Sequence, residues 1–530
     1  MSNEDKSLSL ARERKAWIGY DFANSCYATV AIATFLPLVL NAYAESEAWR
    51  GKLKPKMCST LDVEYSEKCL ECRVGEGNLL CSGPGLNREN CEDLETVRVS
   101  GGFRPSSFAF VIISFSCVSQ LLVFALYGAR GDTGYRKKGL RMTTVLGGAS
   151  LLVFAAFSER HAGYKHVLAA ILAVFSNTMY GLSVIFYNSY LPILAKESEA
   201  ILSEGKEEDH DYENELSTKG YAAGYLSGVL GLLLSLVVLF LSGGSDEDAS
   251  DNKASSAFRW CIVLAGAWWL GFGVYFCEKL RDDEVNEEEK QEQQENSELA
   301  RMKDSLGRFA RTIAEAKSKF PVTFSFLILY FAYTDGFSTI AGLGVLYAQR
   351  DMCTGTTGLF LIALLAPLSA AVGNFLFLLI KRKLNASNQA MVVSALFSIS
   401  LLPIWGLLGY VSNSIGFRNS WEAYFLAIWF GLNLGAIQSF SRTLFCELIP
   451  PHRESEFFSF FELTDKGSSW VGPLVISIMA NSSGNLRRSF WYILCMTIIP
   501  AFFVLRLDVE KGKQMVKRTK QIREEDEEPI

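Results

Sequence analysis

The residues with the clearest chemical potential are charged and amide side chains that lie inside apolar stretches. Asp21 and Asn24 interrupt the apolar run WIGYDFANSCYATVAIATFLP, and Asp335 and Arg442 lie in similar surroundings further along the chain. A charge inside a membrane segment is unfavourable and normally faces the interior of a helix bundle or a water-filled cavity. These residues therefore predict a polar site enclosed by membrane-spanning helices.

Such a site predicts the binding of a molecule that carries both signs of charge. Asp21 or Asp335 could bind an ammonium group. Arg442 or Lys466 could bind a carboxylate, and Asn188, in the stretch FYNSYLP, adds an amide. An amino acid carries both charged groups. The alternative is that these charges pair with one another to hold helices together, or that the lysine extends to the membrane surface.

Proton coupling would require a group that titrates within a span. The four histidines lie in loops or at the ends of apolar runs, which leaves carboxylates as the candidates. These carboxylates are Asp21, Asp335, Glu462 and Asp465. No GxxxxGK[ST] phosphate-binding motif is present, so transport would be secondary. We expect an amino acid, with or without protons, as the ligand, and no enzyme activity, cofactor or metal.

The composition requires a lipid bilayer around these residues. Apolar residues make up 49% and aromatic residues 13% of the 530 residues, and 37 are phenylalanine. A water-soluble core could not use so many bulky apolar side chains without exposing them. No basic stripe with interleaved aromatic residues is present, so nucleic acid is not an expected partner.

Runs of about 18 or more apolar residues predict about twelve membrane helices and an all-α fold. The predicted spans are 16–44, 106–128, 139–157, 166–194, 217–242, 257–277, 320–348, 356–380, 388–410, 421–448, 456–481 and 488–507. They group into an N-terminal half at 16–277 and a C-terminal half at 320–507, with six spans in each. Tails at 1–15 and 508–530 and a charged linker at 278–319 complete the chain.

The end of the linker, SLGRFARTIAEAKSK, has the periodicity of an amphipathic helix. The apolar residues expected on one helical face are Leu306, Phe309, Ala310 and Ile313. The basic residues expected on the opposite face are Arg308, Arg311 and Lys317. Such a helix would lie on the membrane surface. The alternative is a solvated linker without fixed structure.

Three short similarities suggest that the two halves are repeats. The matching pairs are LSTKG at 216–220 with LTDKG at 463–467, FYNSYLP at 186–192 with FSRTLF at 440–445, and DFANS at 21–25 with DGFST at 335–339. Parallel halves related by an axis along the membrane normal would place a substrate site near the bilayer midplane. Asp21 and Asp335 would then face one central cavity from opposite sides.

Lysine and arginine are concentrated in short loops on one side of the membrane. The loops at 128–141 and 381–383 are basic, so the positive-inside rule places both termini in the cytosol. The loop at 45–105 then faces an oxidising lumen or exterior. Its cysteines, with one from a short loop on the same side, are disulfide candidates, namely Cys58, Cys69, Cys72, Cys81, Cys91 and Cys353. The CxxC at 69–72 lacks a matching second pair, so zinc is not expected.

Glycines recur at every fourth residue in the fifth predicted span, at Gly220, Gly224 and Gly228. Small residues at this spacing allow membrane helices to approach closely. The interface could move during transport or pack statically, and the sequence leaves both interpretations open. Lys219 precedes the first of these glycines, and Gly467 ends the matching stretch in the second half.

Three stretches carry a family pattern, namely WIGYDFANSCYATVAIATFLP at 17–37, STKGYAAGYLSG at 217–228 and SFSRTLFCELIPPHRESEFFSFFELTDKGSSWVGP at 439–473. Together they resemble the autophagy-related vacuole effluxer family, a branch of the major facilitator superfamily. The loop GARGDTGYRKKG at 128–139 also resembles the superfamily's cytosolic gating motif, with Gly134 one residue early. This resemblance implies gating roles for Asp132, Arg136 and Lys137.

The resemblance implies a twelve-helix transporter of the vacuolar membrane that exports amino acids recovered from autophagic breakdown. We expect neutral or hydrophobic amino acids to move to the cytosol by alternating access. One alternative is a carrier for another small solute, such as a sugar or an organic acid. Another is a transporter-like receptor or scaffold. The polar residues at matching places in both halves argue against a scaffold, and the oligomeric state is not indicated.

Overall fold

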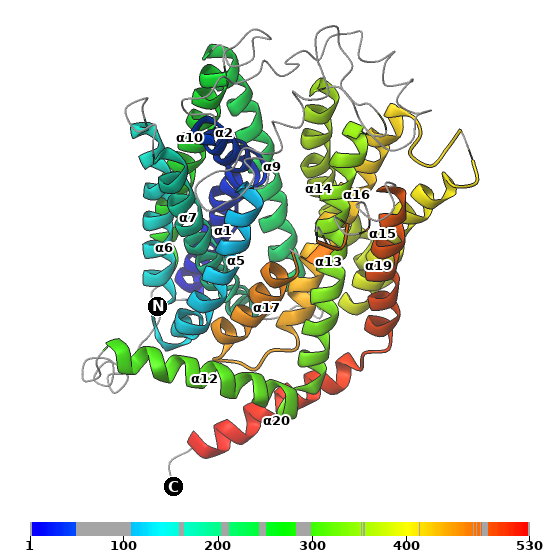
Figure 1. Ribbon diagram of the computed structural model, residues 1–530. Helices are drawn as coiled ribbons and strands as arrows, with labels where there is room; N and C mark the ends of the chain where they lie inside the picture. The colour runs from blue at the N-terminus through cyan, green and yellow to red at the C-terminus, as the bar shows by residue number, and fades with distance from the viewer. Residues whose placement is uncertain are drawn as a thin grey trace, which may run out of the picture.

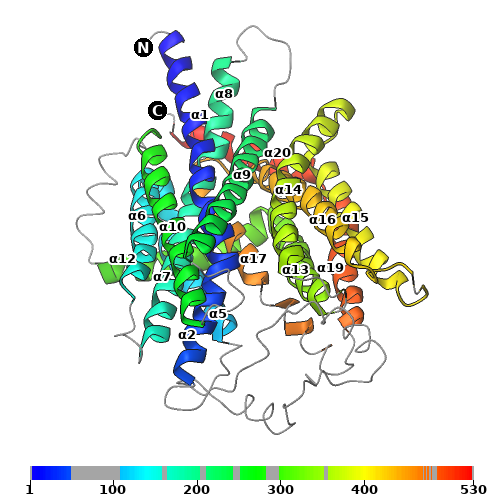
Figure 2. The same cartoon turned by 90° about the horizontal axis from the view of Figure 1, so that it is seen from above.

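The computed structural model is an all-helical bundle whose two halves stand side by side (Figures 1 and 2). It describes residues 3–48, 108–157, 164–202, 211–242, 251–281, 298–350, 352, 356–412, 414–469, 471, 472, 474–476, 479 and 486–527. Within these ranges, 10 helices are long and apolar enough to cross a membrane. The pair Ser489–Leu505 and Val509–Thr519, bent by 62°, brings the number to 11. The all-α membrane fold is confirmed, whereas the described part does not reproduce twelve spans.

The first half begins with a long helical segment. Helix α1 (Asn3–Cys26) continues through a π-helical stretch, η1 (Tyr27–Phe35), into α2 (Leu36–Ala48). The other helices are α5 (Phe108–Tyr127), α6 (Arg136–Leu152), α7 (Lys165–Asn188), α8 (Leu191–Leu202), α9 (Tyr212–Leu241) and α10 (Asp251–Cys277). Short 3-10 turns are η3 (Gly128–Thr133) and η4 (Val153–Ala156). Helix α1 therefore begins within the stretch predicted as a tail.

The second half is preceded by α12, which contains the amphipathic helix expected in the linker. Its elements are α12 (Glu298–Lys319), α13 (Pro321–Arg350), α14 (Thr356–Leu384), α15 (Asn388–Leu408), α16 (Ser420–Cys446), α17 (Glu454–Ser468), η6 (Leu486–Arg488), α19 (Ser489–Leu505) and α20 (Val509–Glu527). The span predicted at 456–481 is seen as α17 and a few residues after it. Helices α12 and α20 lie across one end of the bundle, which we call the linker face (Figure 1).

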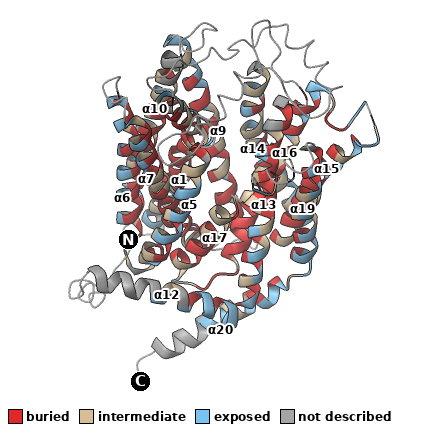
Figure 3. Cartoon of the chain, viewed as in Figure 1, coloured by how far each residue is buried: buried red, intermediate tan, exposed pale blue. Residues whose placement is uncertain are grey.

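Two contacts join the halves. Helix α9 packs against α14 and α16, and α17 packs against α5, α7 and η3. Buried residues lie mainly where helices face one another, and exposed residues lie mainly on the outward faces (Figure 3). Many of the exposed residues are large and apolar. Phe115, Val237 and Leu379 are examples of these exposed side chains. Such an outer surface suits contact with lipid, so polar groups inside the bundle are shielded from water by protein and bilayer.

Candidate substrate and gating sites

Asp21 lies where α1 crosses α9 at close range, and it is only 5% exposed. A carbon added at Gly224 of α9 would lie 2.5 Å from Ser25 Oγ and 3.3 Å from Asp21 Oδ1. The Ser25 hydroxyl donates a hydrogen bond of 3.1 Å to the same carboxylate oxygen. A carbon added at Gly220 would lie 3.2 Å from Asp21 Oδ2 and 3.0 Å from the Tyr187 hydroxyl. The glycines therefore bring the α9 backbone directly against a buried carboxylate.

The remaining predicted packing residues differ in their surroundings. Gly228 extends the close approach of α9 from α1 to η1, since an added carbon would lie 2.6 Å from Thr29 Oγ1. Lys219 is exposed and forms an ion pair of 2.5 Å with Glu215, one helical turn away. The nearest atom to a carbon added at Gly467 is 3.7 Å away. The close crossing therefore belongs to α9 and not to the matching glycine of α17.

Arg442 projects from α16 into the interface between the halves and is 1% exposed. Its Nε donates to Ser217 Oγ at 3.1 Å, and its Nη2 donates to the Ser217 carbonyl at 3.0 Å. Its Nη1 donates to Asn188 Oδ1 at 3.1 Å. The guanidinium carbon lies 4.0 Å from the centre of the Tyr221 ring and 5.0 Å from that of Trp17. Aromatic faces and neutral acceptors thus hold a charged fork that can bind a carboxylate.

Asn188, the last residue of α7, connects Arg442 to a carboxylate. Its side-chain oxygen accepts from Arg442, and its Nδ2 donates to Glu462 Oε1 at 3.0 Å. Glu462 is 5% exposed and interacts electrostatically with Lys466. Lys466 in turn bonds Asp465 at 2.6 Å. Charges of both signs therefore form one connected group at the contact between the halves.

Asp21 belongs to the same group. It interacts electrostatically with Arg442, and its carboxylate lies beside the Tyr187 hydroxyl. The Trp17 ring stacks on Tyr187 with a centroid distance of 4.6 Å, and its Nε1 donates to the Tyr187 carbonyl at 2.9 Å. We call Asp21, Asn188, Arg442, Glu462 and Lys466 the central cluster.

Asp335 has a separate set of partners. Its Oδ1 accepts from the Gly472 amide at 2.8 Å, and its Oδ2 accepts from the Tyr492 hydroxyl at 2.6 Å. Thr339, one turn later, faces Gly472 closely, just as the corresponding serine faces a glycine in the first half. The repeat seen in the sequence therefore recurs in space. The hydrogen bonds of Asp335 nevertheless stay within the second half, whereas the central cluster spans both halves.

Aromatic residues around the central cluster were missed by sequence reasoning. The guanidinium carbon of Arg442 lies 5.0, 5.8 and 4.0 Å from the ring centres of Trp17, Tyr187 and Tyr221, respectively. The available signal was the nearness of Trp17 and Tyr221 to charged residues, in WIGYD and KGYAAGY, and of Tyr187 to Asn188, in FYNSYLP. Asn24, which was predicted as a site residue, is buried on α1, and its side-chain oxygen accepts from Ser25 Oγ at 3.3 Å.

A second polar site lies at the linker face, where η3 meets the start of α17. Asp132 accepts from the backbone amides of Ser455 and Glu456 at 2.8 and 2.9 Å. A carboxylate at a helix N-terminus satisfies free amides and interacts favourably with the helix dipole. Arg136 Nη2 lies 3.4 Å from Asp132 and 4.0 Å from Glu454. The first half therefore caps a helix of the second half.

Ion pairs join the halves at the same face. Lys381 of α14 pairs with Asp211, the residue that caps α9. Arg382 Nη2 lies 3.7 Å from Glu215. Lys137, the third residue of the predicted gating set, is half-buried, and its carbonyl oxygen faces α10. The ion pairs of Lys381 and Arg382 hold the two halves together at the linker face, whereas the Lys137 contact lies within the first half.

The linker helix α12 is joined to this face through Arg453. Arg453 donates to Glu315 Oε2 at 3.0 Å, to Thr312 Oγ1 at 3.2 Å and to Glu456 Oε2 at 2.6 Å. Burial opposes ionisation of Glu315, but the hydrogen bond from Lys319 and the charge of Arg453 outweigh it. The pKa of Glu315 therefore lies below its usual value. The ion pair between Arg453 and Glu315 therefore connects α12 to the turn that begins α17.

The disulfide candidates Cys58, Cys69, Cys72, Cys81, Cys91 and Cys353 lie outside the described residues. The cysteines that the structure describes have free thiols, and they are Cys26, Cys117, Cys261, Cys277, Cys446 and Cys495. Across the described ranges, no three histidine, cysteine, aspartate or glutamate side chains are placed to hold a metal ion.

Residues 10–517 match the family described as vacuole effluxer Atg22 like. Autophagy-related protein 22-1 of Phaeosphaeria nodorum is 26% identical, covering 97% of this chain and 93% of that protein. Autophagy-related protein 22-1 of Aspergillus clavatus is 27% identical, covering 96% and 90%.

Solved transporters of the major facilitator superfamily share the fold. The proton:xylose symporter XylE bound to 6-bromo-6-deoxy-D-glucose has 11% identity and a TM-score of 0.56, with 93% of this chain and 96% of that chain covered. The E. coli fucose:proton symporter FucP has 10% identity and a TM-score of 0.53, covering 95% and 99%. These similarities show the fold of a transporter.

Proposed function

This chain belongs to the vacuole effluxer family of membrane transporters, and we propose that it carries neutral or hydrophobic amino acids from the vacuole lumen to the cytosol. Transport is secondary, and the two halves alternate access to a site between them. The proposal places both termini and the linker face in the cytosol, because lysine and arginine are concentrated in the short loops at that end.

The observation that carries the proposal is the central cluster, whose buried charges of both signs come from both halves. A substrate carboxylate binds the guanidinium of Arg442, replacing its bonds to Asn188 and Ser217. The substrate ammonium binds Asp21. A sugar carries no charged group to pair with either Asp21 or Arg442, and an organic acid would engage only Arg442.

The surroundings of these charges favour an apolar substrate side chain. Trp17, Tyr187 and Tyr221 border the guanidinium. Aromatic rings offer large apolar surfaces, so a leucine-like side chain gains contact area there. Glu462, held between Asn188 and Lys466, is the carboxylate that we propose for proton coupling.

The linker-face contacts support an alternating mechanism. Opening of this face would separate Asp132 from the start of α17 and Lys381 from Asp211. The structure then corresponds to the state that is closed toward the cytosol. In that state, Arg442 is bonded to Asn188 and Ser217, so substrate arriving from the lumen must displace protein acceptors that are already in place.

Counterflow into proteoliposomes tests the substrate class. Proteoliposomes that contain the purified full-length protein would be loaded with unlabelled leucine, xylose or citrate and challenged with the same solute in labelled form. We expect accumulation of leucine at least tenfold above protein-free liposomes, and xylose and citrate at the background level. Accumulation of xylose or citrate without leucine would contradict the proposal.

A further inference from the structure

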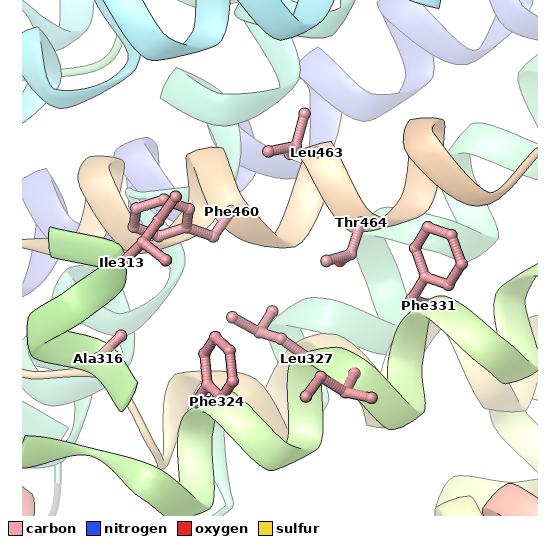
Figure 4. A pocket seen from close by; sticks show the side chains of 9 residues that line it. Ile313, Ala316, Phe324, Leu327, Phe331, Phe460, Leu463 and Thr464 are labelled. Carbon is pink, nitrogen blue, oxygen red and sulfur yellow. The ribbon is translucent and has the colours of Figure 1, made fainter. Parts of the chain in front are cut away.

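A groove lined almost entirely by apolar side chains lies between α12, α13 and α17, away from the central cluster (Figure 4). Its volume is about 310 Å³. Leu327 and Phe331 of α13 form one wall, Phe460 and Leu463 of α17 form the other, and Ile313 of α12 closes one end. Figure 4 shows Phe324, Leu327 and Thr464 between the ribbons of α13 and α17, with Ile313 at one end of this space.

The chemistry of the groove excludes a polar ligand. Thr464 is the one lining residue with a polar side chain, and its hydroxyl already donates to the Phe461 carbonyl at 2.7 Å. Water is unstable in a space that offers no hydrogen-bond partner, and an ion or a sugar would lose its hydration without compensation. A hydrocarbon chain is the ligand that such walls can bind.

The groove is open to the surroundings of the bundle. Ile328 on its rim is 55% exposed, and Ile313 is 39% exposed. Helix α13 is a membrane span, so its exposed apolar surface faces lipid. An acyl chain can therefore enter from the bilayer without crossing the protein.

A basic side chain lies near the end of the groove where α12 runs along the linker face. The expectation that Lys317 lies opposite Ile313 is wrong: Lys317 follows Ile313 by one turn of α12, so the two residues share a side of the helix. Lys317 is exposed. A cation about one helical turn from an apolar slot complements a lipid with a negative headgroup and a hydrocarbon tail.

We propose that this groove binds one acyl chain of an anionic phospholipid, whose headgroup contacts Lys317. The chain fills the space beneath α12 and packs along α17. Because Arg453 ties α12 to the turn before α17, and Asp132 caps that same helix, the bound lipid stabilises the closed linker face. The lipid acts on the equilibrium between the two states of the transporter, and not on substrate binding.

Photolabelling of the full-length protein in nanodiscs tests the site directly. The probe is phosphatidylserine with a diazirine in its acyl chain. We expect labelled peptides from α12, α13 and α17, and at least tenfold stronger competition by unlabelled phosphatidylserine than by phosphatidylcholine. Labelling confined to other helices, equal competition by the two lipids, or crosslinks to a second copy of this chain at these helices would each overturn the proposal.

Two kinds of variant separate the tail from the headgroup. Leu327→Trp fills the groove and should reduce labelling at least tenfold, whereas Leu401→Trp, at a 52% exposed position on α15, should not. Lys317→Glu should remove the preference for phosphatidylserine, whereas Lys383→Glu, at an exposed lysine of α14, should retain it. Elution at the wild-type position in size-exclusion chromatography checks folding. Unchanged labelling and lipid preference in both Leu327→Trp and Lys317→Glu would refute the site.

Discussion

Replacing Arg442 by lysine tests whether transport requires the planar guanidinium or only a positive charge. Arg442 donates through three nitrogens, to both Ser217 oxygens and to Asn188, at 3.0 to 3.1 Å. Its guanidinium also lies 4.0 Å from the centre of the Tyr221 ring. A lysine ammonium keeps the charge beside Asp21 but cannot form two parallel bonds to a carboxylate.

The expected loss follows from the number of bonds. A hydrogen bond to a charged group contributes about 1.5 kcal/mol at the lower end of its range. Losing two such bonds in the transition state of transport corresponds to about 3 kcal/mol, or roughly a 100-fold fall in kcat/KM. Membrane abundance should stay close to that of the wild type, because the buried carboxylate retains a cation nearby.

Initial rates of leucine uptake into proteoliposomes, normalised to the amount of reconstituted protein, provide the assay. Arg506→Lys, at an exposed arginine following α19, is the matched control and should transport normally. If Arg442→Lys transports within about threefold of that control, the guanidinium has only a structural role and the reasoning fails.

Three further perturbations follow from the same contacts. Asp21→Asn should abolish uptake at normal abundance. Asp335→Asn should instead lower the free energy of unfolding by about 2 kcal/mol, because it weakens the hydrogen bonds from the Gly472 amide and the Tyr492 hydroxyl. The opposite pattern would reverse the two roles. Gly224→Ala should lower the free energy of unfolding by about 1–3 kcal/mol. Gly271→Ala is the control and should not, because a carbon added at Gly271 meets nothing within 4 Å. Equal shifts in the unfolding temperature of the two variants would contradict the close crossing of α1 and α9. Asp132→Ala removes the acceptor of two α17 amides and should open the linker face. Spin labels at the exposed Lys138 and Lys383 should then report longer distances, and an unchanged distance distribution would count against a gate at this position.

Periodicity and spacing were sufficient to predict the helical bundle and some of its contacts. The apolar runs predicted most spans, because a long hydrophobic segment in a bilayer has to be helical. The four-residue glycine spacing of Gly220, Gly224 and Gly228 predicted a close helix crossing, which α9 makes with α1. The similarity of 21–25 to 335–339 predicted a repeat that the structure reproduces as a carboxylate and a hydroxyl facing a glycine.

The partners of each charge could not be predicted, because they depend on how each helix is rotated about its axis. Sequence spacing places Asn188 and Arg442 in different halves but does not reveal that one bonds the other and Glu462. The matching spacing at 21–25 and 335–339 also gives no reason to expect different surroundings for Asp21 and Asp335. In the structure, the first acts within the central cluster, and the second holds the Gly472 amide and Tyr492.

Uptake of leucine and of two analogues tests the central claim most directly, because each analogue lacks one charge. Leucinamide lacks the carboxylate that Arg442 is proposed to bind, and 4-methylvalerate lacks the ammonium proposed for Asp21. Competition against labelled leucine in proteoliposomes would measure all three. We expect both analogues to compete at least tenfold more weakly than leucine. An analogue that competes as well as leucine would contradict the claim that a single substrate molecule engages both charges of the central cluster.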